Sequence, residues 1–361
     1  MNGSYYYFEP ILPALTPDEE RCMRKSYSRF FLSLGIYTIS ALAVIYLSQI
    51  IILIVLGLDK GMEFLSGNLY IWTAQIVSMY VIAYPILWLI VWKMPRKKRE
   101  RTKISLEEFV TLFLISEAVM LIGSTVSTTV TSVMSGILGY EIKDTTSELI
   151  MNSPEWVIIL VAVVIGPIFE ELIFRKLFID RASVYGDRLA VIVSAISFGL
   201  FHGNLSQLLY AGALGLILGY LYVKTRDVRL TALLHILINF VGTAPAVFAK
   251  DSIAKLEELA ISETISEADA VAILGDSMAV MGISLVQYVL AALGIAALVI
   301  VLKRGLLKLP DNTYERVGEN GTSEYITVPA GQAVKCVLLS VGAILFAVTV
   351  IIQFVFSILP S

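Results

Sequence analysis

The stretch PEWVIILVAVVIGPIFEELIFRKLF, residues 154–178, decides the fold class of this chain. It is long and apolar enough to form one helix across a bilayer core, which needs about 20 residues. It nevertheless contains two adjacent carboxylates, Glu170 and Glu171, and a cation, Arg175. Charged side chains such as Asp, Lys or Arg at membrane depth cost roughly 2.5 to 3.5 kcal/mol each, so they indicate a functional site by default. We therefore predict a membrane helix that carries a site and is kinked at Gly166-Pro167.

The composition agrees with a membrane protein. Of the 361 residues, 57% are hydrophobic and 16% are charged, which excludes a set of soluble domains. The formal net charge of −3 gives no indication of a nucleic-acid partner, because proteins that bind nucleic acid carry a surplus of basic residues on one face. Two cysteines, Cys22 and Cys336, are too few for a disulfide framework or a Cys-rich metal site. There are also only two histidines, His202 and His235.

We predict an all-α polytopic membrane protein with nine hydrophobic segments. Six of them are long, namely Phe30–Leu58, Leu69–Trp92, Phe109–Gly139, Pro154–Phe178, Met278–Leu302 and Cys336–Leu359. Three are shorter, namely Leu189–Gly203, Leu205–Val223 and Leu230–Ala249. Leu189–Gly203 is short for a full crossing, so we expect it to stop inside the membrane and turn at His202 to Asn204. Such a turn is tolerated only where protein or water lines it.

The basic residues predict the orientation of these segments. If the N-terminus is cytoplasmic and the spans alternate, 23 of the 27 Lys and Arg residues fall on the inside, as cytoplasmic loops require. The chain then divides into a cytoplasmic segment with three spans (1–150), a central core (151–250), and a C-terminal part (251–361). This last part contains an acidic outside loop over 250–278, two further spans and an exposed cytoplasmic loop over 303–335. We expect no cleavable signal peptide, since the first 29 residues lack a short apolar core.

Three polar patterns fall within the central core. Glu171 and Arg175 are four residues apart, so they share a helix face and can pair, while Glu170 is rotated from them by about 100°. The other two patterns are Phe198 to His202 and His235 to Asn239. Either histidine alone could be a packing residue held by hydrogen bonds, and the carboxylates could be an ion cluster at the membrane interface. Their concentration on three neighbouring segments favours a site.

Two kinds of chemistry fit these residue types. A carboxylate and an imidazole can activate a water molecule, and a second imidazole with an amide can stabilise the oxyanion that forms when water attacks a carbonyl. This set would hydrolyse a peptide bond without a covalent intermediate. Alternatively, Glu170, His202 and His235 could hold zinc with water as the fourth ligand. The absence of an HExxH motif favours the metal-free alternative but leaves zinc open.

The patterns EExxxR (Glu170 to Arg175), FxxxH (Phe198 to His202) and HxxxN (His235 to Asn239) resemble the CPBP family of intramembrane proteases. This family is also called Abi and includes the type II CAAX prenyl endopeptidases, some of whose bacterial relatives act in bacteriocin immunity. The resemblance covers about Pro154 to Ala249. It implies an active site inside the bilayer that opens toward the cytoplasm. The roles that it implies are water activation by Glu170 and His202, oxyanion stabilisation by His235 and Asn239, and support by Glu171, Arg175 and Phe198.

We accordingly predict an intramembrane endopeptidase, multi-pass in a bacterial cell membrane, whose partners are the bilayer and a peptide or protein substrate. No feature of the sequence indicates a prenylated substrate. The alternative is a noncatalytic immunity or scaffold protein with the same fold. A proton-relay transporter is disfavoured, since broken helices in two matching halves are missing. The remaining polar residues of the spans are expected to form interhelical hydrogen bonds. They are Gln49, Gln75, Glu117, Gln287 and Gln353.

Overall fold

The computed structural model describes residues 15–97, 100–260, 267–309, 313–317 and 322–359. Within these ranges eight helical stretches are long and apolar enough to cross a membrane. They are Pro17–Leu56, Asn68–Val91, Leu106–Leu138, Glu155–Tyr185, Leu205–Thr225, Val228–Phe248, Ser277–Arg304 and Val341–Ile358. The prediction of an all-α polytopic membrane protein is confirmed.

Most of these stretches are single helices, and two are built from several consecutive turns of different type. The α-helices of the N-terminal part are α1 (Pro17–Leu56), α2 (Leu58–Ser66), α3 (Asn68–Ile76), α4 (Tyr84–Val91), α5 (Leu106–Leu138) and α6 (Thr145–Met151). A π-helix, η1 (Val77–Ala83), joins α3 to α4. The stretch Glu155–Tyr185 consists of α7 (Glu155–Val157), η2 (Ile158–Ile165), α8 (Gly166–Glu171), η3 (Leu172–Ile179), α9 (Asp180–Ala182) and η4 (Ser183–Tyr185). The rest comprises α10 (Asp187–Phe201), α11 (Leu205–Thr225), α12 (Val228–Phe248), α13 (Lys250–Ala260), α14 (Glu267–Arg304), β1 (Thr313–Val317), β2 (Ser323–Thr327), α15 (Ala330–Leu338) and α16 (Val341–Ile358).

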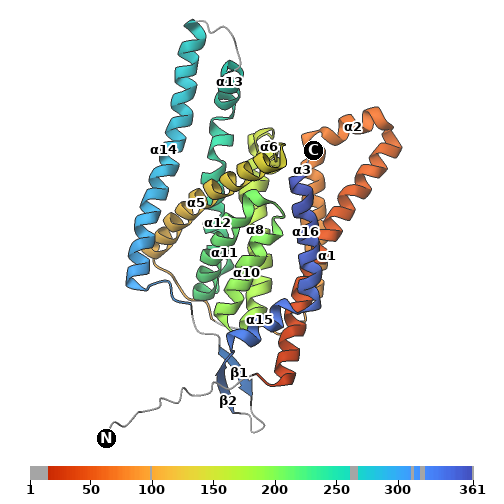
Figure 1. Ribbon diagram of the computed structural model, residues 1–361, viewed down its shortest axis with the longest axis vertical. Helices are drawn as coiled ribbons and strands as arrows, with labels where there is room; N and C mark the ends of the chain where they lie inside the picture. The colour runs from red at the N-terminus through yellow and green to blue at the C-terminus, as the bar shows by residue number, and fades with distance from the viewer. Residues whose placement is uncertain (1–14, 98–99, 261–266, 310–312, 318–321, 360–361) are drawn as a thin grey trace.

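The helices form two flanking groups with a central group between them (Figure 1). On one side, α1 packs against η1, α4 and α16. On the other side, α5 packs against α11 and α14. The central group contains η2, α8 and η3 together with α10 and α12, and α12 packs directly on η2 and α8. The long helix that carries Glu170 and Glu171 is therefore enclosed by protein along much of its length.

The short segment before His202 forms a tight hairpin with the segment that follows. Helix α10 ends at Phe201, and Gly203, with φ of +66°, turns the chain into α11. The two helices lie so close that a Cβ on Gly199 would come within 2.6 Å of the Leu208 carbonyl oxygen, and a Cβ on Gly215 within 2.9 Å of Ala195 Cα. The predicted turn at His202 to Asn204 is confirmed. Helix α10 corresponds to the short predicted segment Leu189–Gly203, and with 15 residues it is too short to cross a bilayer by itself.

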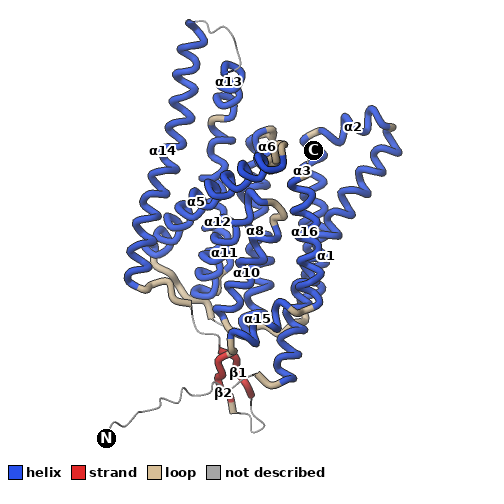
Figure 2. Tube along the Cα trace, in the orientation of Figure 1, coloured by secondary structure: helices blue, strands red, loops and turns tan. Residues whose placement is uncertain are grey.

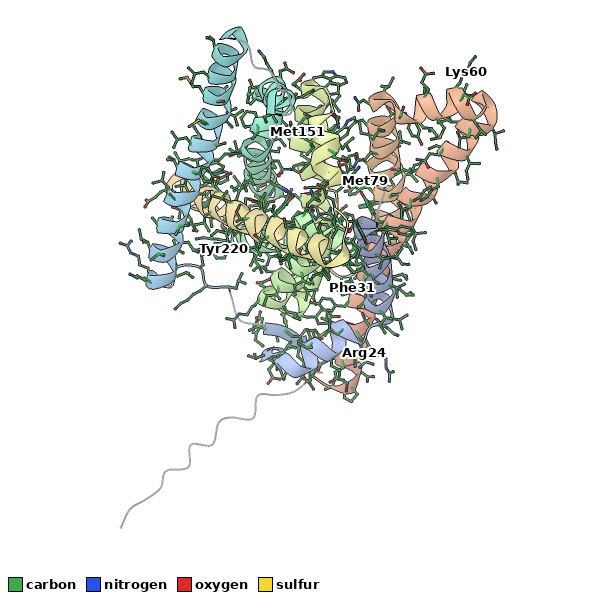
Figure 3. The ribbon with its side chains drawn as sticks, turned by 45° about the horizontal axis from the view of Figure 1, so that its top comes forward. Arg24, Phe31, Lys60, Met79, Met151 and Tyr220 are labelled. Carbon is green, nitrogen blue, oxygen red and sulfur yellow. The ribbon has the colours of Figure 1, made fainter. Side chains whose placement is uncertain are left out.

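The predicted alternation of the spans agrees with the arrangement of their ends. The connections after α4, η4, α11 and α14 lie at the same end of the molecule as the β-hairpin, whereas α2, α6 and α13 lie toward the opposite end (Figure 1). In Figure 3, Arg24 and Lys60 mark these two ends on neighbouring helices. The basic segments predicted to share one side therefore gather at one end of the fold.

Two segments expected to be loops contain regular structure. The segment 303–335 forms the antiparallel hairpin of β1 and β2, which pairs Thr313 with Thr327, followed by α15. This hairpin is the only β-structure among the described residues (Figure 2). The segment 250–278 was expected to be an acidic loop, but its described parts belong to α13 and α14. Glu263, part of the expected acidic cluster, lies outside the described residues.

The β-hairpin connects the base of α1 to the end of the central helix. The guanidinium of Arg316 in β1 binds both carboxylate oxygens of Glu19, at 2.8 and 2.7 Å. The Tyr314 ring stacks on the Tyr185 ring with centroids 5.9 Å apart. Because Tyr185 closes the stretch Glu155–Tyr185, the hairpin fixes the end of the helix that carries the predicted site.

Candidate active site

The predicted kink at Gly166-Pro167 takes the form of a change in helix type. The π-turns of η2 end at Ile165, and α8 begins at Gly166 with Pro167 in its first turn. Proline lacks the N–H that an α-helix would use, so it is favoured at this position. A second π-helical stretch, η3, follows Glu171. π-Helical turns occur frequently at functional sites. Here they flank the short helix α8, which carries both carboxylates.

Glu171 is the centre of a fully buried charged cluster. Its Oε2 atom lies 3.1 Å from Arg175 Nε, and both side chains are 0% exposed. Its Oε1 atom lies 3.1 Å from Nδ1 of His235, which comes from α12. The predicted pairing of Glu171 with Arg175 is confirmed. A contact that the sequence did not predict joins Glu171 to His235 across 64 positions of the chain.

Glu170 lies on the other side of the same imidazole. Its Oε2 atom is 3.6 Å from His235 Nε2, and its side chain keeps 25% exposure, in contrast to the fully buried Glu171. The two neighbouring carboxylates, which were predicted to have different roles, therefore differ in their exposure and in the ring nitrogen that they approach. Glu171 is enclosed and holds one ring nitrogen, while Glu170 is accessible beside the other.

Phe198 separates the two histidines and also covers Arg175. Its ring contacts His202 and His235 edge-on, with centroids 4.9 and 5.8 Å apart. The Arg175 guanidinium carbon lies 4.8 Å from the centroid of the same ring. His202 is further fixed by a 2.8 Å contact from Nδ1 to the Phe198 carbonyl oxygen. This contact uses only one of the two ring nitrogens, so Nε2 can still bind a ligand. The phenylalanine of the FxxxH pattern thus places both imidazoles and the buried cation.

Asn239 lies one helical turn after His235 on α12. Its Nδ2 atom donates to the backbone carbonyl of Ala162 in η2 at 3.0 Å. This bond uses one N–H of the amide and leaves the other for a ligand. The expected shared face of His235 and Asn239 is therefore directed toward the helix that carries the carboxylates.

The donor set expected for zinc is not assembled as a group. Among the described residues, no cluster of three or more His, Cys, Asp or Glu side chains is placed to hold a metal ion. Glu170 and His235 approach each other, but His202 lies beyond the Phe198 ring. We therefore derive no chemical step through a metal from this arrangement.

Several neighbours of the site were not identified from the sequence. Tyr80 of η1 stacks on Phe169, with centroids 4.5 Å and planes 22° apart. Tyr37 of α1 packs against Phe201 at 5.2 Å. Both tyrosines lie outside the three patterns, so no sequence signal connected them to the site. The close packing of α10 and α11 had a signal in the spacing of small residues at every fourth position, Ala195 and Gly199 on one helix and Gly215 and Gly219 on the other.

The scattered polar residues behave differently from one another. Gln287 donates to the Val241 carbonyl at 2.9 Å, which confirms the expected interhelical hydrogen bond. Glu117 is 6% exposed, and its Oε1 atom has no hydrogen-bond partner among the described residues. The same holds for Oε1 of Gln75. These two oxygens therefore make no interhelical hydrogen bond within the described part of the chain.

Comparison with known proteins identifies the central segment. Residues 152–241 match the family model described as type II CAAX prenyl endopeptidase Rce1-like. A stretch of 106 residues is 28% identical to "Putative membrane peptidase YdiL" of Bacillus subtilis (strain 168), covering 28% of this chain and 42% of that protein. The chain thus matches less than half the length of this relative. No solved structure shows a significant match.

The family match contains every residue of the three patterns, including Glu171 and His235, where two helices meet. It excludes α1, α5, α14 and α16, which surround the core. The central segment of this multi-pass membrane protein is therefore similar to the type II CAAX prenyl endopeptidases, in agreement with the resemblance of the three patterns to the CPBP family.

Proposed function

We propose that the protein is an intramembrane endopeptidase that hydrolyses a peptide bond with an activated water molecule. The observation that carries this proposal is the position of His235 between two carboxylates, with Nδ1 3.1 Å from Glu171 and Nε2 3.6 Å from Glu170. Two acidic groups and an imidazole are gathered here in helices that are otherwise apolar. Such a set is expensive to bury without a chemical use.

Water activation is assigned to Glu170 and His202. Glu170 is the more accessible carboxylate, so it can reach a water molecule and accept its proton. His202 keeps Nε2 available because Nδ1 is engaged by the Phe198 carbonyl. The water oxygen then attacks the carbonyl carbon of the substrate, and the proton taken from water passes to the leaving amine.

Oxyanion stabilisation is assigned to His235 and Asn239. The Nδ1–H group of His235 is held by Glu171, which fixes the ring so that Nε2 faces the reaction centre. In its protonated form the ring donates from both nitrogens, to Glu171 and to the oxyanion. The free N–H of Asn239 supplies a second donor. Loss of one such donor typically costs a factor of about 100 to 1000 in kcat.

The supporting residues act by holding His235. Arg175 neutralises Glu171 at 3.1 Å, and the Phe198 ring covers Arg175. Glu171 can therefore remain charged in an apolar interior and orient the imidazole. This arrangement explains how one of two adjacent glutamates can serve structure while the other serves chemistry.

The test compares membranes that contain the wild type, Glu170→Gln or Glu117→Gln. Newly formed peptide termini in membrane proteins are identified by mass spectrometry. We expect termini that appear with the wild type and with Glu117→Gln but disappear with Glu170→Gln. Glu117→Gln is the matched control, because it also replaces a carboxylate of a membrane helix that is shielded from solvent, and Glu117 lies outside the three patterns. Identical termini with and without Glu170 would contradict the proposal and favour a noncatalytic immunity or scaffold role, in which partner binding survives the substitution.

A further inference from the structure

We infer that Tyr80 is a further catalytic residue of this site, whose hydroxyl donates a hydrogen bond to the water molecule that Glu170 activates. The inference rests on the proposed hydrolytic function and assigns a role to a helix outside the segment that matches the family. Tyr80 lies in η1, which packs against α1 and α3.

The Tyr80 hydroxyl lies over the turn of α8 that precedes Glu170. A Cβ placed on Gly166 would be 3.5 Å from the Tyr80 hydroxyl oxygen. Gly166 and Glu170 are four residues apart, so they share a face of α8. Helical side chains lean back toward the N-terminus, and the Glu170 side chain therefore covers the surface near Gly166. The absence of a side chain at Gly166 leaves this space to the phenol and the carboxylate.

Two further contacts agree with this position. The Tyr80 ring stacks on Phe169, the neighbour of Glu170, which fixes the direction of the phenol. Its hydroxyl also interacts electrostatically with the Glu170 carboxylate. Tyr37 repeats the pattern at the second water-activating residue, since its ring packs on Phe201, the neighbour of His202. The Tyr37 hydroxyl interacts electrostatically with both Tyr80 and Glu170.

A phenol in this position has a defined chemical task. Tyr80 is half-buried and can donate its proton in a hydrogen bond without losing it. When the water O–H bond breaks, the proton goes to Glu170, and the water oxygen forms its bond to the substrate carbonyl carbon. Tyr80 keeps its own proton throughout. The hydroxyl holds the water oxygen next to Glu170. This positioning lowers the entropy that the water molecule must lose when it reaches the transition state.

Tyr84 provides a matched control on the same stretch of helix. Its ring contacts the same Phe169 side chain, edge-on at 4.9 Å. Its hydroxyl is not among the atoms within 4 Å of a Cβ placed on Gly166, whereas the Tyr80 hydroxyl is. Tyr80→Phe and Tyr84→Phe each remove one oxygen and keep the ring packing. A general effect of losing a phenol next to Phe169 would therefore appear in both variants.

The experiment uses the full chain in proteoliposomes and a quenched peptide that contains a sequence cleaved in the Glu170-dependent manner described above. For Tyr80→Phe we expect kcat to fall about 10- to 100-fold, the effect of one hydrogen bond to a charged reaction centre. KM should stay within about twofold, because the bond is made to the reacting water and not to the bound peptide. Tyr84→Phe should retain wild-type kcat.

Each result decides between the two proposals. Unchanged kcat in Tyr80→Phe, a rise in KM alone, or an equal loss in Tyr84→Phe would overturn the role of Tyr80 while leaving the hydrolytic function intact. Activity that persists in Glu170→Gln would instead overturn the proposed function itself. A second readout needs no substrate, because infrared difference spectra between proteins with Glu170 and with Glu170→Gln isolate the Glu170 carboxyl bands. These bands should shift in Tyr80→Phe and stay in place in Tyr84→Phe, and bands unmoved by Tyr80→Phe would contradict the inference.

Discussion

Replacement of Arg175 by methionine should strongly destabilise the protein. Arg175 and Glu171 are both 0% exposed, with Nε and Oε2 3.1 Å apart. The two terminal guanidinium nitrogens have no hydrogen-bond partner among the described residues, so Arg175 is held by Glu171 and by the Phe198 ring. Arg175→Met keeps much of the side-chain volume and a favourable contact with the ring, but it leaves Glu171 as a buried carboxylate without its cation.

The expected loss follows from the geometry of the pair. Coulomb's law at this separation gives about 5 kcal/mol with an effective dielectric constant of about 20. Removal of one partner of a buried ion pair typically costs about 3 to 5 kcal/mol. We expect a decrease of about 3 to 5 kcal/mol in the free energy of unfolding, since His235 compensates only part of the charge of Glu171.

The assay is equilibrium unfolding in mixed detergent micelles, carried out as a double-mutant cycle. Arg175→Met and Glu171→Gln are each compared with the wild type and with the double variant. The double variant should recover a large part of the loss, because it leaves no buried charge at these two positions. A loss below about 1 kcal/mol in Arg175→Met, or a double variant as unstable as the sum of the two single changes, would refute this account of the cluster.

Four further outcomes are expected. Asn239→Ala should lower kcat about 100- to 1000-fold with little change in KM, as measured with the same quenched peptide, and an unchanged kcat would remove Asn239 from the site. Protein purified without chelator should contain far less than one zinc per chain and should remain active in chelator; stoichiometric zinc that is lost together with His202 or His235 would instead support the metal alternative. A single cysteine introduced at Lys97 should react only with membrane-permeant reagents, and one at Lys60 with impermeant reagents as well, whereas the reverse pattern would invert the predicted orientation. Asp227, which caps α12, has a pKa lowered by its hydrogen bonds with Arg229, so its contribution to stability should be present at neutral pH and disappear as the pH falls through this lowered pKa. Asp227→Ala should accordingly cost about 1 kcal/mol at neutral pH and little in acid, as followed by thermal unfolding.

Much of the architecture could be predicted from the order of apolar and charged residues. The length of an apolar stretch predicts a membrane-spanning helix, because backbone N–H and C=O groups without hydrogen bonds are too costly in lipid. Eight of the predicted segments correspond to long helices. The turn after His202 was predictable from the shortness of the segment before it. The hairpin of β1 and β2 was not, because its short strands are held by contacts with distant residues, such as Arg316 with Glu19.

The residues of the candidate site could be predicted from the sequence, but the contacts between residues of different helices could not. The i, i+4 spacing predicts the pair of Glu171 with Arg175, since both residues lie on one helix. The bond from Glu171 to His235 joins two helices, and helix periodicity carries no information about which face of a distant helix will meet it. The positions of Tyr37 and Tyr80 were hidden for the same reason, because tyrosines in membrane helices are common and no local spacing links them to Glu170.

The sequence by itself determined that this chain crosses a membrane several times and keeps two glutamates, two histidines, an asparagine and an arginine in its central spans. These properties depend on local composition, because transfer of each segment into lipid is governed by its own side chains and backbone. Only the tertiary structure decided which glutamate is enclosed and which is accessible, and that His235 lies between them. Those properties depend on the packing of α12 against η2 and α8, where helices distant in sequence exclude water from Glu171 and leave Glu170 partly open.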